Sequence, residues 1–255
     1  MLKSSKSLGI IPARFASSRF PGKPLAGIAG KSMIRRVYEQ AAQAQCLGRV
    51  VVATDDERIR AHVLDFGGEA LITSTSHLSG TERCAEVAGF ASFKGFDIVV
   101  NIQGDEPFIE PHQIDLAVNT LRADKTVPIA TLACRIRQQS MLSDPNAVKV
   151  VFDKKGRALY FSRQAIPFLR NAASAEWPAQ QAYYKHIGLY AFRRNALLEI
   201  TALPPSPLEQ AESLEQLRWL ENGYPIAVAP SGRESLSVDT PGDLEELVKH
   251  IHRSR

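Results

Sequence analysis

Short apolar runs alternate with helix-like stretches along the first part of this chain. The apolar runs are rich in β-branched residues and lie at residues 8–11, 50–53 and 98–102. Helix-like stretches lie between them, at residues 33–44, 56–66 and 81–91. Strands that are apolar on both faces are typical of a parallel sheet covered by helices. This order predicts an α/β fold of repeated βαβ units, with a mainly parallel, Rossmann-like sheet flanked by helices.

The pattern changes after about residue 134. Strand-like "AVKVVFD" and "ALYFSR" flank an expected hairpin at residues 154–156, and the polar stretch "RNAASAEWPAQQAY" is expected to be an exposed loop. A helix at 208–222, a strand at 226–229 and a last helix after Pro241, with Thr240 as its N-cap, complete the chain. We therefore expect an α/β core at 1–134, an inserted region at 135–205 and a C-terminal segment at 206–255 that returns to the core.

Composition restricts the class of protein. The 255 residues carry a formal net charge of +4, with acidic and basic residues interspersed, which favours an anionic ligand and argues against nucleic acid. No apolar segment approaches the roughly 20 residues that cross a bilayer, and the N-terminus lacks the apolar segment of a secretion signal. We expect a cytoplasmic protein without membrane insertion. The three cysteines, Cys46, Cys84 and Cys134, lack CxxC spacing and are expected to be reduced thiols.

Chemically useful residues stand where the apolar runs end. The first run ends in Pro12, Ala13 and Arg14, the second in Thr54 and Asp55, and the third in "QGDEP" at 103–107. In open α/β sheets, ligands bind beyond the carboxyl ends of the strands, so these three clusters are expected at one crevice. Basic side chains suit phosphate groups, and a carboxylate suits a hard cation. The sequence thus predicts a site for a nucleoside polyphosphate and its metal.

Two familiar phosphate-binding loops are excluded. Gly30, Lys31 and Ser32 imitate the end of a Walker A motif, but Leu25 stands where the first glycine of that motif belongs. No GxGxxG follows the first apolar run either. The cations of "IPARFASSRFPGKPL" must therefore be organised in another way.

An ordered set of motifs carries a family resemblance. The segments, in chain order from about residue 8 to residue 247, are "IPARFASSRFPGKPL", "VVATDDERI", "SGTERCAEV", "VNIQGDEPFI", "DPNAVKVV", "ALYFSRQAIP", "HIGLYAFR", "SPLEQAESLEQLRWL" and "VDTPGDLEEL". Together they resemble the 3-deoxy-manno-octulosonate cytidylyltransferase family, also called CMP-Kdo synthetases. The resemblance implies transfer of CMP from CTP to the anomeric hydroxyl of the sugar acid Kdo, with release of pyrophosphate and Mg²⁺ as cofactor. It also implies a role in lipopolysaccharide biosynthesis and a homodimer built through the middle region.

The resemblance assigns nucleotide and metal roles to the core segment. Arg14, Arg19 and Lys23 match basic residues that face the triphosphate, and with Asp105 they are the expected catalytic residues. Asp105 and Asp239 match the metal ligands, although Asp239 could equally serve as a capping group beside a helix N-terminus. The expected nucleotide-binding residues are Pro12, Ala13, Arg14, Lys23, Ala53, Thr54, Asp55, Ser79, Gly80, Thr81, Arg83, Gln103 and Gly104. Ser79 can also be an N-cap, and both roles are compatible.

The resemblance assigns the sugar acid to the inserted region and the C-terminal segment. The expected substrate-binding residues are Gln103, Arg163, His186, Tyr190, Glu215 and Gln216. Strand alternation in "YKHIGLYAF" places His186, Gly188 and Tyr190 on one face. In a continuous helix over 208–222, Glu215 falls on the side that periodicity would bury, so it needs a partner. The resemblance favours sugar hydroxyls as that partner, and the alternative is Arg218 at i,i+3.

Two other functions are alternatives to Kdo activation. One is a cytidylyltransferase for a related sugar acid, such as sialic acid or an amino-substituted Kdo. The other is a catalytically silent nucleotide-binding module, which predicts loss of the metal carboxylates or of the loop cations. Both sets are present, and His186 with Tyr190 favours Kdo.

Overall fold

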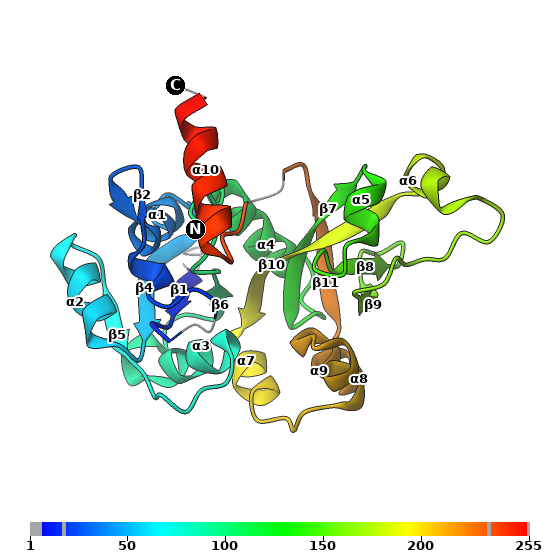
Figure 1. Cartoon of the computed structure of the whole chain (residues 1–255). Helices are drawn as coiled ribbons and strands as arrows, with labels where there is room; N and C mark the ends of the chain where they lie inside the picture. Colours follow the sequence, from blue (N-terminus) through cyan, green and yellow to red (C-terminus); the bar gives the residue numbers. More distant parts are fainter. Residues whose placement is uncertain (1–6, 17–18, 234–235, 254–255) are drawn as a thin grey trace. The chain divides into compact units, whose positions relative to one another are not determined.

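The computed structural model describes residues 7–16, 19–233 and 236–253. The chain forms two compact units (Figure 1). Unit 1 comprises residues 1–115 and 235–255, and unit 2 is the intervening stretch 116–234. These limits differ from the expected boundaries at 134 and 205, because residues 206–234 belong to unit 2 and only the last segment returns to unit 1.

The sheet of unit 1 is parallel, as the apolar runs predict. Its central strand, β1 (Ser7–Ala13), pairs on one side with β4 (Leu47–Thr54) and on the other with β6 (Ile98–Asn101). The outer side of β4 pairs with β5 (Ala70–Ile72). The apolar side chains of β1 and β6 are almost completely buried. Each strand was therefore recognisable because burial on both faces leaves no polar alternation.

The helices of unit 1 begin at side-chain caps. Ser32 Oγ accepts from the amide of Arg35, Asp56 Oδ1 from Arg58 and Ser79 Oγ from Glu82. The capped helices are α1 (Met33–Ala41), α2 (Glu57–Asp65) and α3 (Gly80–Gly89). The shorter elements are η1 (Lys23–Leu25), β2 (Gly27–Ile28), β3 (Lys31–Ser32) and η2 (Ala91–Phe93). Near the C-terminus lies α10 (Pro241–Arg253), and α4 (Pro111–Ala123) spans the limit of the two units.

Unit 2 has a mixed sheet. Strand β7 (Ile129–Ile136) pairs antiparallel with β10 (Tyr183–Arg193) and parallel with β11 (Ile226–Ser231). The expected hairpin is present as β8 (Lys149–Phe152) and β9 (Ala158–Ser162), with Gly156 at a φ of 76° in its turn. The short helices are α5 (Gln139–Ser143), η3 (Ser174–Glu176), α6 (Trp177–Gln180), α7 (Arg194–Ile200), α8 (Pro207–Glu212) and α9 (Glu215–Glu221).

Of two expectations for unit 2, one was right only in part and the other was wrong. Most residues of "RNAASAEWPAQQAY" are exposed as expected, but the stretch is not simply a loop, because it contains η3 and α6, and Trp177 is buried beside Tyr183 and donates its Nε1–H to the carbonyl of Ala172. The helix expected over 208–222 is broken into α8 and α9 at Ser213, whose φ is 51°. The large apolar side chain of Trp177 orders the first of these segments. In the other segment, the left-handed conformation of Ser213 ends α8 early.

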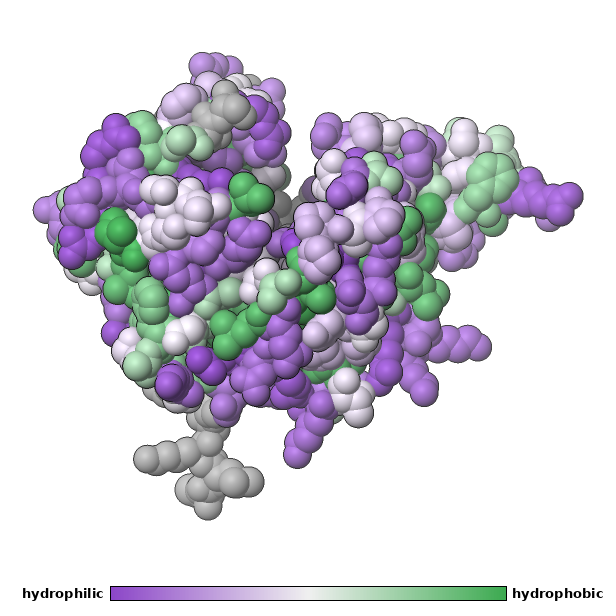
Figure 2. Space-filling view, turned by 90° about the horizontal axis from the view of Figure 1, so that it is seen from below, coloured by the Kyte–Doolittle hydropathy of each residue, from purple (hydrophilic) through white to green (hydrophobic). Residues whose placement is uncertain are grey.

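The surface is mixed in polarity. On the face drawn in Figure 2, hydrophilic and hydrophobic residues are interspersed. Among the residues that the structure describes, no helix combines the length and the apolar character needed to cross a lipid bilayer.

Candidate functional site

A cavity of about 390 Å³ lies in unit 1 beyond the carboxyl ends of β1 and β6. Its walls come from the basic loop after β1, the first residue of α3 and the turn after β6. The lining residues are Pro12, Ala13, Arg14, Ala16, Arg19, Lys23, Pro24, Gly80, Gln103, Gly104 and Asp105. Two of the three expected strand-end clusters therefore meet in one site, together with all three cations assigned to the triphosphate.

Lys23, which lines this cavity, contacts two carboxylates. Its Nζ lies 2.9 Å from Asp105 Oδ2 and 3.5 Å from Asp239 Oδ1, and it donates to the carbonyl of Val238 at 3.0 Å. The amide of Val238 in turn donates to the carbonyl of Asp105, which fixes the two acidic segments against each other. The side chain of Lys23 is 16% exposed, so solvent screens these contacts less than it screens a surface pair. Residues far apart in sequence thus form one charge cluster.

The carboxylate of Asp239 does not cap α10. Thr240 Oγ1 accepts from the amide of Asp243, as predicted for the N-cap, and Asp243 Oδ2 accepts from the amides of Asp239 and Thr240. The carboxylate of Asp239 instead contacts the guanidinium of Arg19 at 3.2 Å and Lys23. Asp243 therefore fills the capping role that was the alternative for Asp239, and the carboxylate of Asp239 contacts two cations that line the cavity.

Two glycines bring backbone close to the end of β1. A Cβ on Gly104 would lie 2.9 Å from the carbonyl oxygen of Pro12, and a Cβ on Gly80 would lie 3.0 Å from Pro12 Cγ. A side chain at either position would therefore force the wall of the cavity to move. The glycines allow the turn after β6 and the start of α3 to approach the ligand space together.

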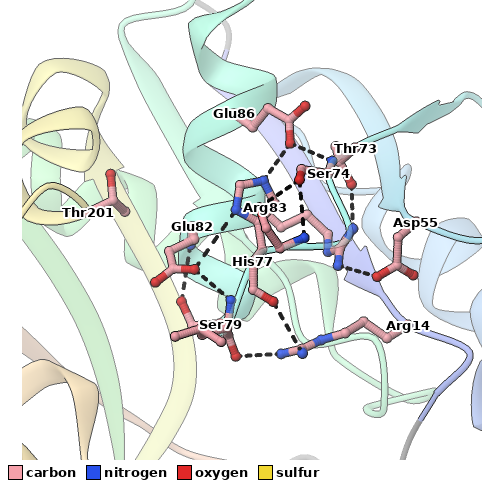
Figure 3. Close-up of polar contacts among 12 residues, drawn as sticks. Arg14, Asp55, Thr73, Ser74, His77, Ser79, Glu82, Arg83, Glu86 and Thr201 are labelled. Atoms are coloured by element: carbon pink, nitrogen blue, oxygen red, sulfur yellow. Dashed lines mark hydrogen bonds and ion pairs between the residues drawn. The ribbon is translucent and has the colours of Figure 1, made fainter.

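Arg14 is oriented by carbonyl oxygens. One guanidinium nitrogen donates to the carbonyl of Leu78 at 2.7 Å, and the other donates to the carbonyl of His77 at 3.4 Å (Figure 3). No carboxylate within the described ranges forms an ion pair with it. Neutral acceptors fix the side chain without cancelling its charge, which leaves Arg14 suited to a phosphate.

Asp55 is held by a buried cation. Arg83 is fully buried, and it donates to Asp55 Oδ2 at 2.7 Å and to Thr73 Oγ1 (Figure 3). The side chains of Ala53 and Thr54 are also fully buried, and they do not line the cavity. The cluster expected at the end of the second apolar run, Thr54 and Asp55, therefore does not reach the cavity wall with its side chains. Thr81 and Arg83 are likewise buried, so they support the fold around the site.

In unit 2, Arg163 ties together three backbone carbonyls. Its guanidinium donates to Pro145 O at 3.1 Å, Glu212 O at 2.7 Å and Ser213 O at 3.3 Å. Its amide also donates to the carboxylate of Glu212 at 2.9 Å. Arg163 thus holds the junction of α8 and α9, and part of its five-donor set remains for another acceptor.

His186 and Tyr190 meet on β10, although the predicted alternation is interrupted. The pairing of β10 with β7 shifts register between Ile187 and Tyr190, and residues 189–192 are all buried. The rings of His186 and Tyr190 nevertheless lie 5.2 Å apart. His186 Nε2 lies 3.0 Å from Thr131 Oγ1. The two expected residues are therefore neighbours on an irregular strand.

Burial sets the protonation of this pair. It lowers the pKa of His186 to about 3, with a smaller contribution from Lys185. Burial also raises the pKa of Tyr190 well above its usual range. The hydroxyl of Tyr190 has no hydrogen-bond partner among the described residues. Both side chains are therefore neutral near neutral pH, which suits contacts with sugar hydroxyls.

In α9, Glu215 pairs with Arg218, which is the alternative partner given by the sequence. Glu215 Oε1 lies 3.2 Å from the Arg218 guanidinium, and that guanidinium also contacts Glu209 Oε2 at 3.2 Å. Gln216 is buried. Contact of Glu215 or Gln216 with a sugar stays a prediction.

Sequence reasoning missed four contributors to these sites. The carbonyls of His77 and Leu78 orient Arg14, and the carbonyl of Val238 holds Lys23. Trp219 packs edge-on against Tyr190, with ring centroids 5.1 Å apart. Backbone acceptors leave no signal in residue type, whereas the tryptophan beside the "EQLR" motif could have been noticed.

Known proteins resemble this chain over almost its whole length. Residues 8–231 match a family model described as Cytidylyltransferase. A 3-deoxy-manno-octulosonate cytidylyltransferase of Bacteroides thetaiotaomicron is 55% identical over 252 residues, which cover 96% of this chain and 99% of that protein. A protein of the same name from Syntrophotalea carbinolica is 53% identical over 245 residues, which cover 95% of this chain and 97% of the relative.

A solved structure shares the fold. CMP:2-keto-3-deoxy-manno-octonic acid synthetase complexed with CTP aligns with a TM-score of 0.91 and 42% identity, and the alignment covers 98% of this chain and 100% of that one. The α/β architecture with a mainly parallel sheet is confirmed, and so is the resemblance indicated by the ordered motifs.

Proposed function

Because this chain belongs to the cytidylyltransferase family, we propose that it transfers CMP from CTP to the anomeric hydroxyl of 3-deoxy-D-manno-octulosonate (Kdo) and releases pyrophosphate. The observation that carries this proposal is the cavity of unit 1, which lies beyond the ends of β1 and β6 and is lined by three cations and by Asp105, with Asp239 in contact with two of those cations. The relative bound to CTP, 42% identical over nearly the full chain, supports CTP as the nucleotide. A related sugar acid is the less favoured alternative.

The reaction mainly requires positioning and neutralisation of charge. The anomeric oxygen of Kdo forms a bond to the α-phosphorus of CTP, the bond from that phosphorus to the bridging oxygen of pyrophosphate breaks, and the sugar hydroxyl loses its proton. Negative charge grows on the departing pyrophosphate. Arg14, Arg19 and Lys23 bind the triphosphate and stabilise that charge, the largest single contribution in such chemistry.

Asp105 and Asp239 would hold Mg²⁺. Their side chains already converge on the ammonium of Lys23, so the site is arranged for two carboxylates around one positive charge. Within the described part of the chain, no cluster of three or more His, Cys, Asp or Glu residues could enclose a metal. The two carboxylates of Asp105 and Asp239 fit Mg²⁺, which binds through one or two carboxylates together with waters and substrate phosphates. When bound, the ion supplies Lewis-acid polarisation of the phosphate oxygens.

The residues of unit 2 bind the sugar acid in this proposal. Arg163 offers its remaining guanidinium donors to the Kdo carboxylate, a group that a planar fork fits well. The unpartnered hydroxyl of Tyr190 and the neutral ring of His186 contact sugar hydroxyls. Glu215 and Gln216 lie at the start of α9, next to the junction that Arg163 holds.

Further parts of the proposal concern the cellular setting. A product of this kind serves lipopolysaccharide biosynthesis, and we place the enzyme in the cytoplasm, where CTP is available. A homodimer built through the middle region belongs to the same proposal and rests on the family resemblance.

A pyrophosphate-release assay tests the proposed function. Purified protein with CTP and Mg²⁺ is offered Kdo, an amino-substituted Kdo and sialic acid in parallel, with UTP and ATP as nucleotide controls. We expect the highest kcat/KM with CTP and Kdo, and the product is identified as CMP-Kdo by mass. Turnover with another sugar acid but not with Kdo would show that the other sugar acid, rather than Kdo, is the substrate. Absence of turnover with every sugar acid would contradict the activity itself.

A further inference from the structure

Residues 74–79, here called the 74–79 loop, are fastened to α3 by two glutamates. Glu86 Oε2 accepts from the amide of Ser74 at 2.9 Å, and Glu82 Oε2 accepts from the amide of Leu78 at 2.7 Å. Glu82 and Glu86 stand four residues apart, so they share one face of the helix. The loop is thereby held near both of its ends.

His77 supplies a third fastening inside the loop. Its Nε2 is hydrogen-bonded to Glu86 Oε2, and its Nδ1 lies 3.9 Å from Glu82 Oε2 (Figure 3). An ionised carboxylate can only accept, so Nε2 carries the donated proton. The side chain of His77 is 18% exposed, whereas that of the next residue, Leu78, points into solvent, the residue being 82% exposed. The imidazole of His77 is therefore a side chain that links the 74–79 loop to α3.

The same two loop residues present their carbonyls to Arg14. His77 O and Leu78 O accept the two guanidinium nitrogens, so the position of Arg14 depends on the path of the loop. Arg19 differs, because it contacts the carboxylate of Asp239. To bind a phosphate, Arg14 must be held by groups that do not neutralise its charge. The carbonyls of His77 and Leu78 can do this only if the backbone of the 74–79 loop is fixed.

We propose that His77 is a positioning residue for CTP: its bond to Glu86 fixes the 74–79 loop, and the loop carbonyls hold Arg14 in the nucleotide cavity. This inference rests on the proposed function, in which Arg14 binds the triphosphate. His77 itself does not line the cavity and needs no contact with substrate.

Steady-state kinetics of four variants test the role of His77. His77→Ala should raise the KM for CTP about tenfold, the effect of losing one hydrogen bond to a charged group. The KM for Kdo and kcat should stay near the wild-type values. His77→Gln should restore most of the affinity, because its amide N–H can still donate to Glu86. In an Arg14→Ala background, His77→Ala should add no further increase in the KM for CTP.

His62 offers a matched control. It is also a partly buried histidine with a side-chain hydrogen bond, between its Nε2 and Ser32 Oγ, but this bond involves neither the 74–79 loop nor Arg14. His62→Ala should leave the KM for CTP unchanged. If His77→Ala does not fold, His77→Asn serves as the second loss variant, because its shorter amide cannot span the same distance.

The outcomes separate the inference from the proposed function. An unchanged KM for CTP in Arg14→Ala would remove Arg14 from the nucleotide site and contradict the site assignment. A raised KM in Arg14→Ala with wild-type values in His77→Ala would overturn only the role of His77. Equal increases in both Michaelis constants, or additive effects in the double variant, would also overturn it, since either pattern indicates a general structural defect.

Discussion

The ammonium of Lys23 lies 2.9 Å from Oδ2 of Asp105, and the same ammonium reaches a second carboxylate at Asp239. A lysine with a single acidic partner could be a simple structural pair. Here one cation is shared by both residues that are proposed to bind Mg²⁺, at the edge of the cavity that is proposed to bind CTP. In the proposed function, binding of the metal and the nucleotide would replace contacts that Lys23 already makes, and Lys23 would then contact the phosphates.

Replacement of Lys23 should mainly impair use of CTP. Lys23→Ala should lower kcat/KM for CTP by roughly 10²–10³, because a preorganised cation aimed at developing charge is lost. The measurement is initial rate against CTP at saturating Kdo. Lys31→Ala is the matched control, since Lys31 belongs to the same segment but pairs with Glu39 at the surface. Equal effects of the two substitutions would contradict the assignment of Lys23.

Replacement of either proposed metal carboxylate should change the Mg²⁺ requirement. Asp105→Asn or Asp239→Asn should cut turnover by orders of magnitude and should raise the Mg²⁺ concentration that gives half-maximal rate, because a neutral amide is a weaker ligand for a hard cation. A Mg²⁺ titration of the rate, with Mn²⁺ binding followed by paramagnetic resonance, provides the measurement.

Asp243 controls for the loss of a carboxylate in the same segment. Its side chain accepts two backbone amides at the start of α10. Asp243→Ala should lower the free energy of unfolding by about 1 kcal/mol through loss of capping. The Mg²⁺ requirement should stay as in the wild type. If Asp239→Asn behaves like Asp243→Ala, Asp239 is not a metal ligand.

Replacement of Arg163 should mainly impair use of the sugar. Arg163→Ala should raise the KM for Kdo, since both the carboxylate fork and the support of the α8–α9 junction are lost. The KM for CTP should change little. Arg157→Ala is the control, because Arg157 pairs with Asp124 elsewhere in unit 2. A larger effect on CTP than on Kdo would show that Arg163 acts on the wrong substrate for this proposal.

His186 should make the protein less stable in mild acid. Burial lowers its pKa in the native state to about 3. On acidification, His186 is therefore protonated in the unfolded chain at a pH at which it stays neutral in the native state. The free energy of unfolding therefore falls as pH drops below the ordinary histidine pKa. Relative to His186→Gln, the wild type should lose about 1 kcal/mol between about pH 7 and about pH 5.5.

Urea denaturation of the two proteins across this pH range measures the difference. All other titrating groups are common to both chains, so they cancel in the comparison. A constant difference in unfolding free energy would indicate that His186 titrates as it does in a peptide.

The sequence was most informative about unit 1. The strands β1, β4 and β6 were recognised because they are buried on both faces. The rule for strand ends predicted that Arg14 and Asp105 lie in one cavity, and the family resemblance added Lys23. The end of β4 did not follow the rule. Asp55 is paired with Arg83, a long-range contact between a strand end and a helix face that local sequence does not encode.

Long-range contacts also explain the errors in unit 2. Helical periodicity continues across residues 208–222, but the guanidinium of Arg163 binds the carbonyls of Glu212 and Ser213, which in a continuous helix would accept from later amides. Ser213 accordingly adopts a left-handed conformation. The register shift between Ile187 and Tyr190 has a similar origin, because Thr131 Oγ1 bonds the carbonyls of Ile187 and Leu189.

Arg83 and Arg19 should respond differently to ionic strength because they differ in burial. Arg83 has no exposed surface and pairs with Asp55, whereas the side chain of Arg19 is 65% exposed. Mobile ions screen exposed charges beyond roughly 8 Å at physiological concentration, but they cannot enter a packed interior. Added salt should therefore weaken the attraction of Arg19 for a triphosphate while the pair of Arg83 and Asp55 persists, so concentrated electrolyte should slow capture of the proposed nucleotide without loosening the packing between the end of β4 and α3.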